Sequence, residues 1–317
     1  MKIIYSSKHK LHNPAYEVYD MQQAPYAEVP ERIEIIAKKF RQENAGEFIA
    51  PKSFPISHVE KVHHKNYIEF LKNKSKSLKP TDNFFASYFT TDTYAPMTKD
   101  TFVAAKESAD IALTGAELLE NGEKLIYALC RPPGHHSGAY NMGGYCYINN
   151  AAVAAEYLSA KGKVAILDID YHHGNGTQQM FYDRDDILYV SLHADPREKY
   201  PYITGFKEET GIADGVGFNI NYPLPVDASE ILYKKTLQQA IKNIKKFNPN
   251  FLVISAGFDT YIKDPIAAFK LTIPFYKEIG LQIASLQLPT LVIQEGGYFV
   301  SDLGDIAWSL VKGLSFC

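Results

Sequence analysis

Five apolar runs of strand length in this chain are each followed at once by a loop rich in glycine, histidine or aspartate. The runs lie at about 125–129, 164–167, 187–190, 251–254 and 290–293, and the loops after them read CRPPGHHSG, DIDYHHGNG, SLHAD, SAGFD and QEGGY. In open parallel sheets the ligand lies outside the carboxyl ends of the strands, which share one edge. Polar loops after five strands therefore predict a single active-site crevice along that edge.

Segments of helical period separate the apolar runs, which is the pattern of a mostly parallel sheet with helices on both faces. A chain of 317 residues with 46% hydrophobic residues can bury one sizeable core, so we predict a single α/β domain over residues 1–317. The predicted strands are 3–5, 125–129, 164–167, 187–192, 218–221, 251–254 and 290–293. The predicted helices are 31–40, 99–120, 150–160, 229–247, 273–285 and 300–314.

The overall composition narrows the classes of function. The formal net charge of -3 gives no basic surface for nucleic acid and no polybasic patch for a membrane. The first residues, MKIIYSSKHK, contain no apolar export signal, and no apolar run is long enough to span a bilayer. Cys130, Cys146 and Cys317 form no C-x-x-C pair, which argues against a disulfide framework and a thiolate zinc site. We therefore expect a cytoplasmic protein without a nucleic-acid or membrane partner.

Residues 72–97 interrupt the alternation of strands and helices. They show little periodicity and scattered charge, but they include the aromatic residues Phe84, Phe85, Tyr88, Phe89 and Tyr94. A long loop in a compact domain is usually functional or disordered, and the aromatic content argues against disorder. We expect an ordered insertion that packs against another surface, such as a second subunit. An unstructured surface loop is the alternative.

The loop DIDYHHGNG is the strongest single motif. Asp168, Asp170 and His172 occupy alternate positions in an extended continuation of a strand, so their side chains tend to project to one side. An aspartate and a histidine at this spacing can share one divalent ion, and Asp259 is the natural third ligand of a site with an open position. This ligand set suits zinc, although iron or manganese also fits. Strand-end residues satisfied by capping hydrogen bonds are the non-functional alternative.

The loops RPPGHHSG and EGGY carry candidates for proton transfer and carbonyl polarisation. In a turn rich in proline and glycine, His135 and His136 can both reach one cavity, and neither is needed as a metal ligand. Tyr298 follows two glycines, which is a suitable position for a phenol that donates to a developing oxyanion. A surface histidine pair and an ordinary core tyrosine are the alternatives.

Together these motifs resemble the arginase-like deacetylase superfamily, which includes histone deacetylases and bacterial acetylpolyamine amidohydrolases. The resemblance rests on RPPGHH (131–136), GGYCYINNAA (143–152), LDIDYHHGNGTQ (167–178), SLHADP (191–196), SAGFD (255–259) and EGGY (295–298). The chain looks most similar to the acetylpolyamine branch at KHKLHN (8–13), PYITGFKEETG (201–211), GFNINYPLP (217–225) and DPIAAFKLT (264–272). An arginase/deacetylase-like fold is thereby implied, with the insertion at a homodimer interface and at the active-site entrance.

The resemblance implies a role for each candidate catalytic residue. His136 would be the general base and acid, His135 its electrostatic partner, and Tyr298 the donor to the substrate carbonyl. Asp168 would orient His135. Asn175 would lie behind His136, where class I histone deacetylases usually have aspartate, and the neutral amide should leave His136 less basic.

The resemblance also implies metal and substrate sites. One zinc ion per chain would be held by Asp170, His172 and Asp259, and a structural potassium ion by carbonyls of Asp168, Asp170, His172 and Leu192 with the Ser191 hydroxyl. A second monovalent site is expected near Phe181, Arg184, Ile187 and Phe218. The walls of a narrow tunnel would be Tyr145 and Tyr200 beside Gly144, with Glu17, Asp82 and Asp92 as acidic residues at its rim.

The resulting hypothesis is zinc-dependent hydrolysis of acetylated polyamines or diamines by an activated water, without a serine or cysteine nucleophile. A protein acetyl-lysine deacetylase is the main alternative, which a constricted entrance would disfavour. A catalytically inactive sensor of acetylated amines would have lost a ligand, the base or the tyrosine, and none is missing. A ureohydrolase with two metal ions is disfavoured because the sequence furnishes one metal set.

Overall fold

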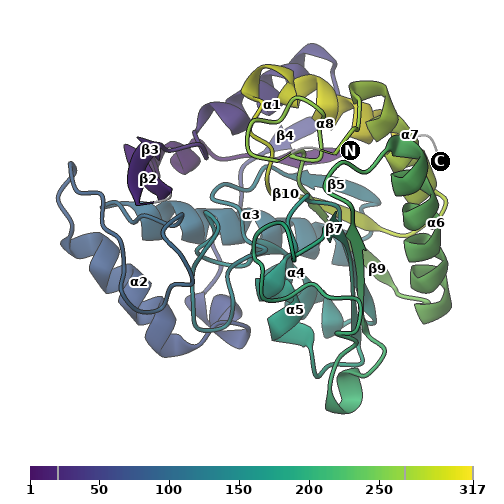
Figure 1. The fold of residues 1–317 in the computed structure, drawn as a ribbon, viewed down its shortest axis with the longest axis horizontal. Coiled ribbons are helices and arrows are strands. Elements are labelled where there is room, and N and C mark those ends of the chain that lie inside the picture. The colour runs from purple at the N-terminus through teal and green to yellow at the C-terminus, as the bar shows by residue number, and fades with distance from the viewer. Residues whose placement is uncertain (20, 268, 316–317) are drawn as a thin grey trace.

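The centre of the molecule is a sheet of eight parallel strands (Figure 1). The structure is a computed structural model that describes residues 1–19, 21–267 and 269–315. Each strand pairs in parallel with its neighbours. In order across the sheet they are β4 (Glu47–Ile49), β1 (Lys2–Ile4), β5 (Leu125–Ala128), β10 (Thr290–Gln294), β9 (Phe251–Ala256), β6 (Val164–Asp168), β7 (Ile187–Ala194) and β8 (Asn219–Leu224).

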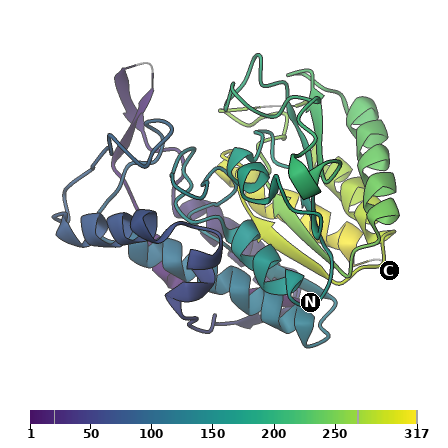
Figure 2. The ribbon, with the colours of Figure 1, turned by 90° about the horizontal axis from the view of Figure 1, so that it is seen from below.

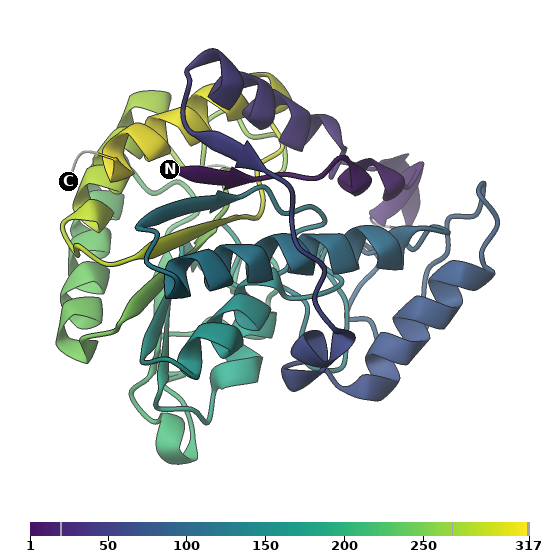
Figure 3. The same cartoon turned by 180° about the vertical axis from the view of Figure 1, so that it is seen from behind.

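Helices cover both faces of the sheet, as the α/β pattern predicts. The apolar core on one face contains residues of α1 (Glu31–Gln42), α6 (Glu230–Phe247), α7 (Ile273–Ala284) and α8 (Val300–Leu314). The core on the other face contains residues of α3 (Thr101–Glu120), α4 (Asn150–Ser159) and α5 (Asn175–Phe181), with α3 lying along the sheet in Figure 3.

Side chains of each central strand alternate between these two cores. In β5, Ile126 and Ala128 belong to the core with α3 and α4, whereas Tyr127 belongs to the core with α1 and α8. Successive residues of a strand point to opposite faces, so a strand covered on both sides is apolar throughout. This burial explains why the central strands read as continuous apolar runs in the sequence.

The five strands with polar loops are consecutive in the sheet. Their order is β5, β10, β9, β6 and β7, and because all are parallel, their carboxyl ends meet at one edge. The predicted fold class, a parallel α/β sheet with one polar edge, is confirmed.

A smaller layer flanks the body of the molecule on one side (Figure 2). It contains the antiparallel hairpin of β2 (Tyr16–Tyr19) and β3 (Gln22–Pro25), helix α2 (Lys65–Ser77) and residues 78–97. Phe84 and Phe89 pack on the buried cluster that includes residues of α2. Asn83 and Thr93 donate side-chain hydrogen bonds of 2.6 and 2.7 Å to main-chain oxygens of β2. Residues 78–97 therefore join the hairpin to the rest of this chain.

The structure differs from the sequence prediction mainly in this layer. Residues 72–77 are the last turns of α2, whose buried face contains Tyr67, Ile68, Leu71 and Ser75, so only the later part of the predicted insertion lacks a regular helix. The hairpin, β4, α2, α5 and the 3-10 helices Ser7–Leu11, Ile56–Lys61 and Ala213–Gly215 were not predicted. Among the described residues, no helix combines the length and apolar character that a membrane crossing requires.

Candidate active site

The loops after β6 and β9 bring Asp170, His172 and Asp259 together. Their potential metal-binding atoms lie within 4.8 Å of one another. Nδ1 of His172 is 2.9 Å from Oδ2 of Asp259 and 3.4 Å from Oδ1 of Asp170. Burial, and then the nearby Asp170 carboxylate, raise the pKa of Asp259 to about 7. Two buried carboxylates around one imidazole favour a bound cation, so this donor set fits one divalent ion with an open coordination position.

Main-chain amides hold the carboxylates of this set in place. The amide of Tyr171 donates to Oδ1 of Asp259, and the amide of Gly296 donates to Oδ2 of Asp170, both at 2.9 Å. A Cβ atom on Gly257 would lie 1.8 Å from Oδ2 of Asp170. The glycines of the SAGFD and EGGY loops thus make room for the Asp170 carboxylate.

His135 lies against carboxylates. Its Nδ1 is 3.1 Å from Oδ2 of Asp168, and its side chain is buried. Burial alone would lower its pKa, but the carboxylates of Asp170 and Asp168 outweigh that effect and raise the pKa to about 10. His135 is therefore expected to carry a positive charge at neutral pH.

His136 has a different partner and the opposite shift. Its Nδ1 is 2.7 Å from Oδ1 of Asn175, at the first turn of α5. An amide oxygen only accepts, so Nδ1 carries the proton and Nε2 is free to accept one. Burial, followed by repulsion from His135 and His172, holds the pKa of His136 well below its usual range. Two adjacent histidines with opposite pKa shifts suit division into a charged partner and a neutral base.

The loop after β10 presents Tyr298. Its main-chain amide donates a hydrogen bond to Oδ2 of Asp264, with a nitrogen-to-oxygen distance of 2.6 Å. The preceding residue, Gly297, has a φ of 111°, a backbone conformation that favours glycine. The Arg32 guanidinium lies 4.9 Å from the centre of the Tyr298 ring. Burial raises the pKa of Tyr298 well above its usual range, so the phenol keeps its proton and can donate a hydrogen bond.

A cavity of about 410 Å³ reaches His136, His172 and Tyr298, whereas His135, Asp170 and Asp259 do not line it. Its walls are aromatic: the rings of Tyr145 and Tyr298 have centroids 5.5 Å apart, and Tyr200 meets His136 edge-on at 4.8 Å. The lining residues are Glu17, Tyr19, Ala24, Tyr94, His136, Gly144, Tyr145, His172, Lys199, Tyr200, Tyr202, Pro265, Ile266 and Tyr298.

Gly144 leaves the space that the His136 ring occupies at the cavity. It has a φ of 50°, and a Cβ atom there would lie 2.4 Å from Cδ2 of His136. Any side chain at this position would displace His136 or strain the turn, so both space and backbone conformation require glycine.

The three acids predicted for the rim have different surroundings. Glu17 lines the cavity and is buried. Asp92 does not line it; its Oδ2 accepts from the Tyr200 hydroxyl at 2.6 Å and from the Gly144 amide at 3.0 Å. Asp82 is also outside the lining, and its Oδ2 accepts from the amide of Lys79.

The residues predicted to bind potassium lie at the end of β6, in the metal-ligand loop that follows it, and in β7. Asp168 and Ser191 are paired residues of β6 and β7, which brings the two segments together. Oγ of Ser191 is 2.7 Å from Nδ1 of His193, whose Nε2 is 2.8 Å from the carbonyl oxygen of Gly205. Since a carbonyl only accepts, Nε2 carries the proton, and the Ser191 hydroxyl donates to Nδ1. The Ser191 lone pairs remain directed elsewhere, as a cation ligand requires.

At the second expected monovalent site, two carbonyls already accept hydrogen bonds. The amide of Arg184 donates to Phe181, and the amide of Tyr189 donates to Phe218. A carbonyl oxygen has two lone pairs, so neither bond prevents cation binding.

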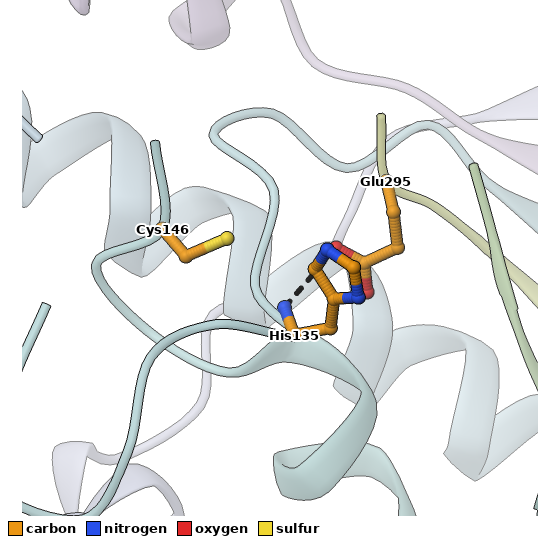
Figure 4. A group of neighbouring side chains, drawn as sticks. All are labelled: His135, Cys146 and Glu295. Atoms are coloured by element: carbon orange, nitrogen blue, oxygen red, sulfur yellow. Dashed lines mark hydrogen bonds between the residues drawn. The ribbon is translucent and has the colours of Figure 1, made fainter. Parts of the chain in front are cut away.

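Three residues that hold the loops of His135 and Tyr298 in place were not predicted from the sequence. Oε2 of Glu295 accepts from the amides of Gly134 and His135 at 2.7 and 3.2 Å. Figure 4 shows the Glu295 carboxylate beside the His135 main chain, with Cys146 nearby. Asp264 holds Tyr298 as described, and Arg32 donates to the carbonyls of Glu295 and Gly297. The glutamate of EGGY was a visible signal, whereas no local pattern indicated the other two residues.

His135, Cys146 and Glu295 also lie close enough to hold a metal ion. However, the Glu295 oxygens accept from main-chain amides and from Ser255, and the Cys146 thiol donates to the carbonyl of Gly144 at 3.3 Å. These contacts make the three residues a support for the histidine turn.

Comparison with known proteins gives consistent matches over the whole chain. A model of the histone deacetylase domain matches residues 26–314. Acetylpolyamine amidohydrolase 2 of Pseudomonas aeruginosa is 39% identical, with 99% of this chain and 98% of the relative covered. Acetylpolyamine amidohydrolase of Mycoplana ramosa is 38% identical, with 99% and 100% covered.

Solved structures also match over nearly the whole chain. The crystal structure of an acetylpolyamine aminohydrolase from Burkholderia pseudomallei superimposes with a TM-score of 0.95 at 34% identity, covering 100% of this chain and 99% of that one. The HDA15 HD domain superimposes with a TM-score of 0.88 at 29% identity, covering 99% and 87%.

Proposed function

This chain belongs to the histone deacetylase family and is an amide-bond hydrolase, and from this premise we propose that it deacetylates acetylated polyamines or diamines. The proposed substrates are of the acetylputrescine, acetylcadaverine and acetylspermidine type. The observation that carries the proposal is that His136, Tyr298 and one member of the three-residue metal set, His172, line a single cavity that also contains a buried carboxylate, Glu17.

Asp170, His172 and Asp259 would hold one divalent ion, for which zinc is the proposed identity. When bound, such an ion supplies Lewis acidity to the acetyl carbonyl and makes a neighbouring water easier to deprotonate. The fit rests on the close approach of the three donors and on the raised pKa of Asp259.

Nε2 of His136 would take a proton from the attacking water and later deliver it to the leaving amine. Asn175 supports this role because it fixes the tautomer that leaves Nε2 unprotonated. His135, held by Asp168, would remain charged beside the developing negative charge.

The Tyr298 phenol would donate a hydrogen bond to the carbonyl oxygen as that oxygen becomes an oxyanion. Donors of this kind typically contribute roughly 3–4 kcal/mol to transition-state stabilisation. Tyr145, Tyr200 and Gly144 would enclose the alkyl chain of the substrate, and Glu17 would neutralise its distal ammonium.

A potassium ion would be bound by carbonyls of Asp168, Asp170, His172 and Leu192 with the Ser191 hydroxyl. A second monovalent ion would be bound near Phe181, Arg184, Ile187 and Phe218. The free lone pairs of Ser191 support the first site.

We also propose a homodimer in which residues 78–97 complete the entrance to the active site. The enzyme would be cytoplasmic, and its buried cysteines, Cys130 and Cys146, would stay reduced. Cys317 lies outside the described residues.

The proposed function is tested by comparing kcat/KM for acetylputrescine, acetylcadaverine, acetylspermidine and an acetyl-lysine peptide on zinc-loaded protein. We expect the best small amine to exceed the peptide by at least about tenfold. A preference for the peptide would favour the protein deacetylase instead.

A further inference from the structure

Tyr298, the donor to the substrate carbonyl in the proposed function, lies in a loop with little rigidity of its own. Gly296 and Gly297 precede it, and glycine leaves the backbone more conformational freedom than other residues do. The Tyr298 hydroxyl forms no hydrogen bond with any residue that the structure describes. The position of the phenol is therefore set by contacts of its ring and of its main chain.

The ring contacts of Tyr298 are not directional enough to fix the hydroxyl. The Arg32 guanidinium lies 4.9 Å from the ring centre, and the Tyr145 ring is tilted by 55° with its centroid 5.5 Å away. A donor must come within about 2.7–3.1 Å of the oxyanion. Because the hydroxyl is at the far end of the side chain, a small rotation of the main chain at Tyr298 would move it out of this range.

The main chain at Tyr298 is held by Asp264, which belongs to a different loop. Oδ2 of Asp264 accepts from the amides of Tyr298 and Phe299, with nitrogen-to-oxygen distances of 2.6 and 3.2 Å. Oδ1 accepts from the amides of Ile266 and Ala267 at 3.0 and 3.2 Å. One buried carboxylate thus joins two loops through four main-chain hydrogen bonds.

The Asp264 carboxylate has a fixed orientation and a favourable place for its charge. The two bonds of Oδ1 are to amides of its own loop, and they direct Oδ2 toward the loop after β10. Phe299 directly precedes α8, so the negative charge lies at the positive N-terminal end of that helix. Pro265 and Ile266, which follow Asp264, line the cavity. Asp264 therefore ties Tyr298 to a wall of the cavity.

We propose that Asp264 is the positioning residue of the oxyanion donor and holds the main chain at Tyr298 so that the phenol points to the substrate carbonyl. This inference rests on the proposed function. Asp264 does not line the cavity, so it acts through the loop and not on the substrate. A contact that only stabilises α8 is the alternative, and it predicts a loss of stability without a specific loss of turnover.

Asp264→Asn tests the inference, because an amide has one acceptor oxygen and cannot serve both pairs of main-chain amides. On zinc-loaded enzyme we expect kcat for acetylcadaverine to fall about tenfold, with KM changed by less than about twofold. Metal content should stay at about one ion per chain, since the ligand set is intact. In hydrogen-exchange mass spectrometry the amides of Tyr298 and Phe299 should exchange faster than in the wild type.

A second variant and a matched control separate geometry from charge. Asp264→Glu keeps the charge at the helix end but moves the oxygens by one methylene group, so it should also lower kcat. Asp302→Asn removes a charge from the first turn of the same helix, but Asp302 accepts from the Tyr261 hydroxyl and not from the Tyr298 amide. It should leave kcat and the exchange at Tyr298 unchanged.

A double-mutant cycle distinguishes positioning of Tyr298 from a general structural effect. Tyr298→Phe should lower kcat by about a hundredfold or more. Asp264→Asn should then add less than about twofold, because the group that it positions is gone. An equal loss in both backgrounds, or an unchanged kcat in either Asp264 variant, would overturn this inference while the proposed function stood. Absence of turnover for every small acetylated amine in the wild type would instead overturn the proposed function.

Discussion

Oδ1 of Asn175 lies 2.7 Å from Nδ1 of His136. The neutral amide fixes the imidazole tautomer without adding negative charge, in contrast to the carboxylate of Asp168 beside His135. With these different partners, His135 and His136 have pKa values shifted in opposite directions, although the two residues are adjacent and chemically identical.

Asn175→Asp should raise the pKa of His136, because a carboxylate stabilises the imidazolium form. The base is active when neutral, so a higher pKa means that activity is lost earlier as the pH falls. We therefore expect the acidic limb of the kcat/KM profile to move to higher pH. Asn175→Ala removes the hydrogen bond without adding charge and should lower kcat without that displacement. An acidic limb that stays in place in Asn175→Asp would contradict the assignment of His136 as the base.

His136→Ala should lower kcat by at least about a hundredfold, the usual contribution of a positioned general base. Its metal content should remain about one ion per chain, since His136 is outside the ligand set. Asp259→Ala is the informative contrast, because it removes a ligand and should lose the metal together with activity. Metal analysis of both purified variants separates the two roles, and full turnover in His136→Ala would rule out the base assignment.

Local patterns in the sequence predicted the sheet, and they also indicated Asp170, His172 and Asp259, which the structure brings together. Continuous apolar runs mark strands buried on both faces, and the polar residues that end them include Asp170 and His172. The central strands were predicted to within a few residues, since burial leaves little freedom in composition.

The residues that hold the active-site loops in place could not be predicted from local patterns. Arg32 is one of several charged residues of α1, yet it is buried and donates to the loop that carries Tyr298. Which helix residue faces that loop depends on packing between segments more than 260 positions apart. Similarly, nothing near Asp92 in the sequence indicates that it accepts from Gly144 and Tyr200.

Asp92→Asn should widen or loosen the cavity, because an amide cannot match a carboxylate as acceptor for both the Gly144 amide and the Tyr200 hydroxyl. We expect KM for acetylcadaverine to rise by roughly tenfold, with a smaller change in kcat, as for loss of about 1–2 kcal/mol of binding. Asp82→Asn removes the same charge from the same segment, but Oδ2 of Asp82 accepts from the amide of Lys79 and not from Gly144 or Tyr200. Equal effects of the two variants would indicate a general electrostatic contribution in place of positioning by Asp92.

His63 provides a pH-dependent contribution to stability away from the site. Its Nδ1 is 3.0 Å from the carbonyl of Gly138, and its Nε2 accepts from the amide of Asn149 at 2.9 Å, so the neutral ring is fully bonded. Burial lowers the pKa of His63 to about 3 from its usual value of 6.5. Between these pH values the unfolded chain binds a proton that the folded chain does not, so stability falls as the pH drops below 6.5.

At pH 5 this single group should cost about 2 kcal/mol of unfolding free energy relative to pH 7. His63→Gln is expected to be less stable at pH 7, where it lacks one of the two bonds, but to lose about 2 kcal/mol less between pH 7 and pH 5. Urea unfolding of both proteins at the two pH values measures the difference, in which contributions of other buried histidines cancel. An identical loss of stability in the two proteins would mean that His63 takes up a proton equally in the folded and unfolded states.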